Sequence, residues 1–248
     1  MKTTGRTALI VGGTSGIGLE FAHQLTALGN SVVITGRDRE RVEELATEHG
    51  FAGEVVDVTD AASITALRDR VVDRFPDLDT VLISSGIMLP ERHLEADALE
   101  VAERTISTNL LGTIRVFTAF LPHLRTRPEA SIITVTSGLA YVPMPLTPTY
   151  SATKAGVHAF TEAVRAQLRG TPVQLIELAP PLTRTTLMGP STDHAGAMPL
   201  GEFVSEAIGL IQADPDIRQV LVDRVKPQRF AAVDGTYDEL FENLVARL

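Results

Sequence analysis

Short apolar stretches alternate with helical patterns through the first two thirds of the chain. These stretches are TALIV at 7–11, SVVIT at 31–35, GEVVDV at 53–58, TVLIS at 80–84, SIITVTS at 131–137 and PVQLIEL at 172–178. A strand that is apolar throughout must be covered on both faces, as in a parallel sheet between two layers of helices. Right-handed crossovers between such strands predict a doubly wound α/β fold.

Helical patterns fill the intervals between these stretches. We expect helices at about 16–28, 97–109, 112–125 and 150–169, and an amphipathic C-terminal helix at about 236–247. No linker or repeat divides the 248 residues, so we interpret 1–248 as a single domain. The segment 186–199 has weak periodicity and several Pro and Gly residues. We expect a substrate loop there, because long irregular segments at strand ends are usually functional.

Composition excludes several classes of protein. The net charge of −9 argues against a non-specific nucleic-acid binder, and the absence of cysteine excludes disulfides and thiolate metal sites. The six histidines do not pair at metal-ligand spacing, so we predict no metal, and we interpret His158 as a surface or packing residue. No apolar run is long enough for a membrane span. These features predict a cytoplasmic protein without a membrane or nucleic-acid partner.

A glycine-rich turn follows the first predicted strand. The stretch VGGTSGIG at 11–18 places Gly12, Gly16 and Gly18 between this strand and the next helix. Such glycines allow a tight turn, close approach of the backbone to a pyrophosphate, and close packing of helix on strand. A Walker P-loop is excluded because no Lys-Ser/Thr pair follows the last glycine. The alternative is a tight turn with a purely structural role.

The end of the second predicted strand indicates which dinucleotide would bind. Gly36 and Arg37 stand where a fold that prefers NAD usually has Asp or Glu for the ribose hydroxyls. A guanidinium suits a 2′-phosphate, so the sequence favours NADP(H), with NAD(H) as the alternative. The competing interpretation is that Arg37 is one of many solvated charges on the next helix.

Five motifs in this order resemble those of the short-chain dehydrogenase/reductase family. They are GGTSGIG at 12–18, DVTD at 57–60, NLLG at 109–112, Ser137 at the end of the fifth strand, and YSATK at 150–154. The stretches FPDLDTVLISSGIM, ELAPP and RVKPQRFAAVDGTYDELFENL are most similar to the DltE-like branch of that family. The resemblance implies a Rossmann-type sheet of about seven parallel strands and an NAD(P)-dependent oxidoreductase.

The resemblance assigns roles to four residues. Tyr150 would be the acid/base. Lys154, on the same helix face one turn later, would lower the pKa of Tyr150 and bind the nicotinamide ribose. Ser137 would hydrogen-bond the substrate oxygen, and Asn109 would interrupt its helix and hold a water in a proton relay to Lys154. Taken singly, Tyr150, Lys154 and Ser137 each have a structural alternative in packing, solvation or capping.

The resemblance also implies a set of cofactor-binding residues. They are Gly12, Thr14, Ser15, Gly16, Ile17, Gly18, Arg37, Asp57, Val58, Ser84, Ser85, Gly86, Tyr150, Lys154, Pro180, Thr183 and Thr185. Pro181 departs from the family, which often has glycine there. Ile83-Ser84-Ser85-Gly86 replaces the usual Asn-Asn-Ala-Gly. Since both asparagine side chains are gone, we expect the Ser84 hydroxyl to help stabilise the sheet in their place.

Apolar side chains in the loops after the strands predict the substrate pocket. They include Leu139, Tyr141, Met144 and Met188. Such a pocket suits a hydrophobic ketone or secondary alcohol. The sequence therefore predicts an NADP(H)-dependent carbonyl reductase or alcohol dehydrogenase.

Two other functions stay open at this stage. One is a non-catalytic dinucleotide-binding regulator or scaffold. The other is a sugar-nucleotide epimerase or dehydratase, for which the chain leaves little room after 178. By resemblance, the helices at 112–125 and 150–169 would associate in a homodimer or homotetramer.

Overall fold

The computed structural model describes residues 1–93, 98–189 and 196–246, which form one parallel sheet of seven strands. The strand order is β3-β2-β1-β4-β5-β6-β7. The strands are β1 (Thr7–Val11), β2 (Ser31–Gly36), β3 (Ala52–Val55), β4 (Thr80–Ile83), β5 (Ala130–Val135), β6 (Val173–Leu178) and β7 (Gln219–Val220). The predicted doubly wound, Rossmann-type fold is confirmed.

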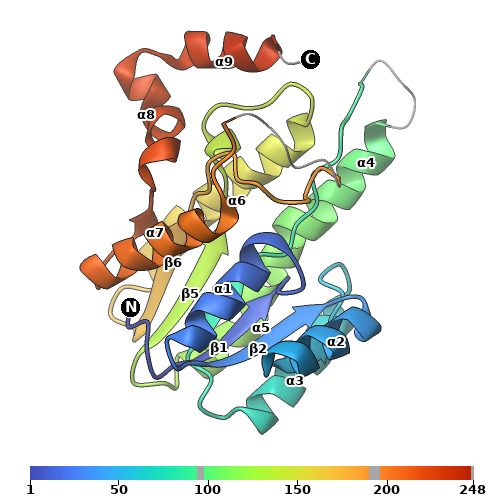
Figure 1. Ribbon diagram of the computed structural model, residues 1–248, viewed down its shortest axis with the longest axis vertical. Helices are drawn as coiled ribbons and strands as arrows, with labels where there is room; N and C mark the ends of the chain where they lie inside the picture. Colours follow the sequence, from blue (N-terminus) through green and yellow to red (C-terminus); the bar gives the residue numbers. More distant parts are fainter. Residues whose placement is uncertain (94–97, 190–195, 247–248) are drawn as a thin grey trace.

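Helices cover the sheet in two layers. One layer contains α1 (Gly16–Ala27), α2 (Arg39–His49) and α7 (Leu200–Ala213), and the other contains α3 (Ala61–Arg74), α5 (Gly112–Leu124) and α6 (Pro148–Gln167) (Figure 1). Successive residues of β1 alternate between the two cores: Ile10 packs with the first layer, and Leu9 and Val11 with the second. This alternation explains why the strands are apolar at every position.

The two helices expected at 97–109 and 112–125 form one continuous helical segment. A π-helical stretch at Ile106–Leu111 connects α4 (Ala98–Thr105) to α5. The wider π turn absorbs an extra residue without breaking the helix, and such turns are frequent at functional sites. Asn109 lies within it, so the interruption expected at this residue is a change of helical pitch.

The C-terminal region lies beyond the carboxyl ends of the strands. A short 3₁₀ turn (η3, Asp223–Val225) leads into α8 (Lys226–Asp234) and then α9 (Tyr237–Val245), the red arm in Figure 1. The helix expected at about 236–247 corresponds to α9, and residues 247–248 lie outside the described part.

The expected substrate loop at 186–199 is described only in part, because 190–195 fall outside the described residues. The flanks of this gap are nevertheless joined, since Thr183 forms an isolated parallel bridge with Met198.

Candidate active site

The predicted functional residues gather at the carboxyl ends of the central strands. β1 and β4 are neighbours, although the chain runs outward from β1 through β2 and β3 before it returns to β4. In doubly wound sheets, ligands bind at the point where the strand order reverses in this way. The topology therefore places the site between the turns that follow β1 and β4.

The glycine turn after β1 lies directly against the chain after β4. Gly12 has a φ of +84°, and a Cβ atom there would be 2.6 Å from the backbone nitrogen of Ser85. Both the left-handed backbone and the close approach require glycine. Among the described residues, no side chain caps the start of α1 at Ser15, so the first N–H groups of this helix are available to an anion.

A cleft extends from this turn toward the β3 edge. Its lining includes Gly12, Arg37, Asp57, Val58 and Gly86. The backbone N–H and the hydroxyl of Thr59 both donate to Asp57 Oδ1, at 2.8 and 2.7 Å, and these bonds lower the pKa of Asp57. The exposed guanidinium of Arg37 acts in the same direction. The cleft therefore presents an ionised carboxylate and a guanidinium close to the glycine turn.

The segment that replaces the family's Asn-Asn-Ala-Gly is stabilised by other means than we expected. Ile83 is buried in the core, and the backbone N–H of Ser84 donates to the Val11 carbonyl at 2.8 Å. The Ser84 hydroxyl has no partner in the described part of the chain. Instead, Asn109 Oδ1 accepts from the Ile87 N–H and Asn109 Nδ2 donates to the Ile87 carbonyl, each at 2.8 Å. Asn109 thus fixes the backbone after β4, a role that sequence reasoning did not assign to it.

Tyr150, Lys154 and Ser137 come together in the interior. Tyr150 and Lys154 lie on the first two turns of α6, where i and i+4 share a face, and both are buried. Lys154 Nζ lies 5.6 Å from the centroid of the Tyr150 ring and donates to the Val135 carbonyl at 2.8 Å. Ser137 follows β5, its Oγ accepts from the Leu139 N–H at 3.1 Å, and its side chain lies near enough to Tyr150 to act on the pKa of the phenol.

Burial controls the protonation of this pair. It raises the pKa of Tyr150 to about 12, and the hydrogen bond with Ser137 acts in the opposite direction. It also lowers the pKa of Lys154 to about 8. The shift of Tyr150 is opposite to the one expected from the nearby ammonium, because removal from water disfavours the phenolate. The structure thus holds a protonated phenol beside a lysine at neutral pH.

The segment after β6 reaches the glycine turn. Pro180 accepts a hydrogen bond from the Gly138 N–H at 2.8 Å, and Thr183 Oγ1 donates to the Pro181 carbonyl at 3.0 Å. Thr185 lies beside Gly16, where a Cβ atom would be 3.6 Å from Thr185 Cγ2. Of the two threonines expected to contact a cofactor, Thr185 therefore faces the turn, whereas the Thr183 hydroxyl bonds to the backbone of Pro181.

The four predicted substrate residues differ in their surroundings. Leu139 and Met144 are half-buried in the chain after β5, and Met188 is exposed. The hydroxyl of Tyr141, in contrast, donates to Glu177 Oε1 at 2.8 Å. Glu177 is a buried residue that sequence reasoning missed, and the available signal was that it is the one charged residue in the predicted strand 172–178.

The described residues also bear on two other kinds of site. Across 1–93, 98–189 and 196–246, no helix has the length and apolar character to cross a membrane. In the same residues, no group of three or more His, Asp or Glu side chains is arranged to hold a metal ion.

Comparison with known proteins agrees with this geometry. Residues 6–196 match the family model for short chain dehydrogenases. A curated relative, the uncharacterized oxidoreductase DltE of Bacillus subtilis, is 35% identical over 254 residues and covers 98% of each chain.

Solved structures share the fold. A short chain dehydrogenase from Burkholderia cenocepacia in complex with NADP has a TM-score of 0.83 at 23% identity, covering 98% of this chain and 99% of its own. A short chain dehydrogenase/reductase from Burkholderia phymatum in complex with NAD also has a TM-score of 0.83, at 19% identity, covering 97% of this chain and 95% of its own. The glycine turn, the buried Tyr150–Lys154 pair and these matches agree, and this chain belongs to the short-chain dehydrogenase/reductase family of NAD(P)-dependent oxidoreductases.

Proposed function

We propose that this protein is an NADP(H)-dependent carbonyl reductase that acts on an apolar ketone, with Tyr150 as the proton donor. The observation that carries the proposal is the buried, protonated phenol of Tyr150 beside Ser137 and Lys154. Reduction of a carbonyl requires a proton for the developing alkoxide, and a phenol that stays protonated at neutral pH can provide it.

Ser137, Tyr150 and Lys154 have different roles in this proposed reaction. A bound nicotinamide dinucleotide would supply the hydride. The Ser137 hydroxyl binds the carbonyl oxygen, and Tyr150 Oη transfers its proton to that oxygen as negative charge develops. The Lys154 ammonium, 5.6 Å from the ring centroid, stabilises the phenolate that is left. Asn109 fixes the backbone beside Gly86 and Lys154, and the proton relay expected from it stays a prediction.

The residues of the cleft fit a dinucleotide phosphate. Gly12 lets the turn pack directly on the backbone of Ser85, and the start of α1 offers free N–H groups to the pyrophosphate. Asp57 and Val58 would hold the adenine. Arg37 would pair with the 2′-phosphate, since its guanidinium lines the cleft and has no hydrogen-bond partner among the described residues.

The substrate and the assembly are proposed on the same basis. Leu139, Met144 and Met188 would form an apolar wall of the substrate pocket. The expected substrate loop at 186–199 lies partly outside the described residues and stays a prediction. Self-association through α5 and α6 would give a homodimer or homotetramer.

A thermal-shift comparison followed by turnover assays tests the function. We expect NADPH to raise the melting temperature more than NADH at equal concentration, because stabilisation by a ligand grows with the logarithm of its concentration divided by its dissociation constant. We then expect NADPH oxidation with at least one member of a panel of apolar ketones. A larger stabilisation by NADH would contradict the role of Arg37. Strong stabilisation by NADPH without turnover of any ketone would favour a non-catalytic dinucleotide-binding protein.

A further inference from the structure

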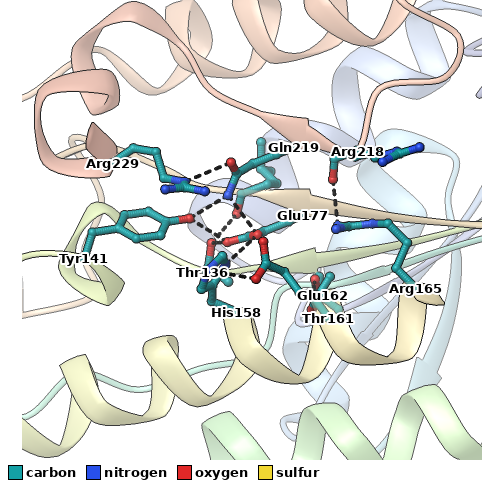
Figure 2. Close-up of polar contacts among 12 residues, drawn as sticks. Thr136, Tyr141, His158, Thr161, Glu162, Arg165, Glu177, Arg218, Gln219 and Arg229 are labelled. Carbon is teal, nitrogen blue, oxygen red and sulfur yellow. Dashed lines mark hydrogen bonds and ion pairs between the residues drawn. The ribbon is translucent and has the colours of Figure 1, made fainter. Parts of the chain in front are cut away.

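Glu177 is a carboxylate buried near the carboxyl end of β6. It is 1% exposed, and four side chains from different parts of the chain hydrogen-bond to it (Figure 2). Burying a charge is costly unless it is paired and hydrogen-bonded. The proposed chemical step does not use this side chain, so the network around it points to another role.

One oxygen of Glu177 binds both ends of the segment that carries Ser137. Thr136 Oγ1 and the Tyr141 hydroxyl each donate to Oε1 at 2.8 Å. These two residues flank 137–140, which contains Ser137 and the short 3₁₀ turn η2 (Gly138–Ala140). Both ends of the segment are therefore hydrogen-bonded to one buried atom, Glu177 Oε1.

The other oxygen binds the helix that carries Tyr150. His158 Nδ1 bonds to Glu177 Oε2 at 2.8 Å, and Gln219 Nε2 donates to the same oxygen at 2.9 Å. His158 lies on α6, one turn after Lys154 and two turns after Tyr150. The carboxylate thus spans the distance between the Ser137 segment and the Tyr150 helix.

Helix α8 also packs against the segment that carries Ser137. Arg229 Nε donates to Gln219 Oε1 at 3.0 Å, and the Arg229 guanidinium lies 4.9 Å from the centroid of the Tyr141 ring. Its neighbour Gln228 packs on Gly138, where a Cβ atom would be 2.1 Å from Gln228 Oε1. The same network therefore fixes α8 against the turn.

We propose that Glu177 is a positioning residue: it sets the Ser137 hydroxyl relative to Tyr150 by tying the 137–140 segment to α6. It acts through Thr136 and Tyr141 on one side and through His158 on the other. This inference rests on the proposed carbonyl reduction, since Ser137 and Tyr150 are its reacting groups.

The surrounding charges favour an ionised pair at this position. The bond to Glu177 raises the pKa of His158, and Glu162 adds to it, with His158 Nε2 3.6 Å from Glu162 Oε2. Burial opposes ionisation of Glu177, but the bonds from His158 and its partners hold its pKa below the ordinary value. The remaining charged or titratable groups that face the network are Tyr141, Arg165 and Arg229. Charge-assisted bonds of this kind are short and directional, which suits a positioning role.

The test uses wild-type enzyme with a ketone that it reduces. The substitution Glu177→Gln keeps the shape of the side chain, removes its charge and replaces one accepting oxygen by an N–H donor. The groups that now donate to that oxygen must then turn or detach, and the charge-assisted bond with His158 is lost. We expect kcat to fall about tenfold with the dissociation constant of NADPH unchanged, because small displacements of reacting groups are costly. We also expect the limb of the kcat–pH profile that belongs to Tyr150 to move to higher pH, since a displaced Ser137 no longer lowers its pKa.

A matched control separates positioning from stability. Asp79→Asn breaks the 3.0 Å ion pair with Arg6 just before β4, at the amino ends of the central strands, whereas the site lies at their carboxyl ends. It should lower the melting temperature and leave kcat and the pH profile as they are. If Glu177→Gln does not fold, Tyr141→Phe removes one hydroxyl from Oε1 and should shift kcat and the profile in the same directions by less.

Two results would overturn the inference. One is wild-type kcat and an unmoved profile in every folded variant of the network. The other is an equal effect of Asp79→Asn. A wild-type enzyme that binds NADPH but reduces no ketone overturns the proposed function instead, and this is known before any variant is made.

Discussion

The two halves of the site are built in different ways. The half between β1 and β3 consists of backbone groups and an open cleft: a glycine turn, the uncapped start of α1, and the exposed Arg37. The half between β5 and β7 consists of buried polar side chains, Lys154 and Glu177 among them, with most of their partners inside the protein. The first half is open to solvent and the second is buried, and burial gives Tyr150 and Lys154, both in the second half, strongly shifted pKa values.

We therefore expect the two halves to control different properties: the affinity for the dinucleotide in the open half, and the rate of the chemical step in the buried half. Changes in the open half should alter which dinucleotide binds and how tightly. Changes in the buried half should alter the rate and its pH dependence while the dinucleotide still binds. Each prediction below tests that separation.

The largest effect is expected in the buried half. Tyr150→Phe should lower kcat by about 10²–10⁴-fold, the usual contribution of a positioned acid, and leave the dissociation constant of NADPH within error. The control is Tyr237→Phe in α9, where the ring stacks on Phe241 outside the site. Ketone turnover and NADPH binding are measured for both. Comparable loss in the two variants, or unchanged turnover in Tyr150→Phe, would end the assignment.

A large effect on binding is expected at Gly12 in the open half. Gly12→Ala adds a Cβ atom 2.6 Å from the Ser85 nitrogen, so the turn must move and thermal stabilisation by NADPH should be lost. Gly29→Ala is the matched control, because Gly29 has a similar φ of +81° but nothing within 4 Å of the added atom. The control should cost about 1–2 kcal/mol of stability from backbone strain alone and keep NADPH binding. Retained binding in Gly12→Ala would show that the turn does not hold the dinucleotide.

A smaller effect is expected at Arg37. Arg37→Gln should weaken NADPH about tenfold, as expected for loss of a hydrogen bond to a charged group, and leave NADH unchanged. Arg39→Gln removes the same charge from a side chain that pairs with Glu43 on α2. Isothermal titration of both dinucleotides with the two variants measures the difference. Equal weakening of NADPH by both substitutions would mean that Arg37 acts only through overall charge.

The smallest effect concerns pH and the Glu177–His158 pair. Since the pKa of Glu177 is lowered from 4.5 on folding, its contribution to stability is present above that pH and is lost on acidification. Since the pKa of His158 is raised from 6.5, its contribution is present below that pH and is lost as pH rises through the folded value. The stability lost in His158→Asn should therefore be largest between about pH 4.5 and 6.5, and amount to about 1 kcal/mol there.

Urea unfolding of wild type and His158→Asn across this pH range measures the difference. His23→Asn is a control, because His23 packs against His49 and Phe51 away from the site. A difference that does not vary with pH would contradict the ion pair.

Several features of this protein could be predicted because they are local. Continuous apolar runs predict strands that are buried on both faces. The spacing of Gly12, Gly16 and Gly18 predicts a tight turn that few other residues could form. The i, i+4 spacing of Tyr150 and Lys154 places them on one face of any helix. These patterns depend on a few neighbouring residues, so the fold and the central pair were accessible without a structure.

Other features depend on residues that are distant in the chain. The pairing of Asn109 with the Ile87 backbone, and the binding of the Tyr141 hydroxyl by Glu177, join segments 22 and 36 residues apart. No local pattern encodes such contacts. For this reason Tyr141 was assigned to the substrate pocket, while the structure places its hydroxyl in a buried network.

The sequence by itself determined the order of strands and helices, the family, and the residue types that meet at the carboxyl ends of the strands. Only the tertiary structure decided the environment of each group. It buries Tyr150 deeply enough to raise its pKa to about 12, a direction opposite to the one that the neighbouring lysine suggests. It also surrounds Glu177 with hydrogen-bond partners from three separate parts of the chain: the segment after β5, α6 and β7. Burial and hydrogen bonding are properties of the packed chain, and they determine how a residue type behaves.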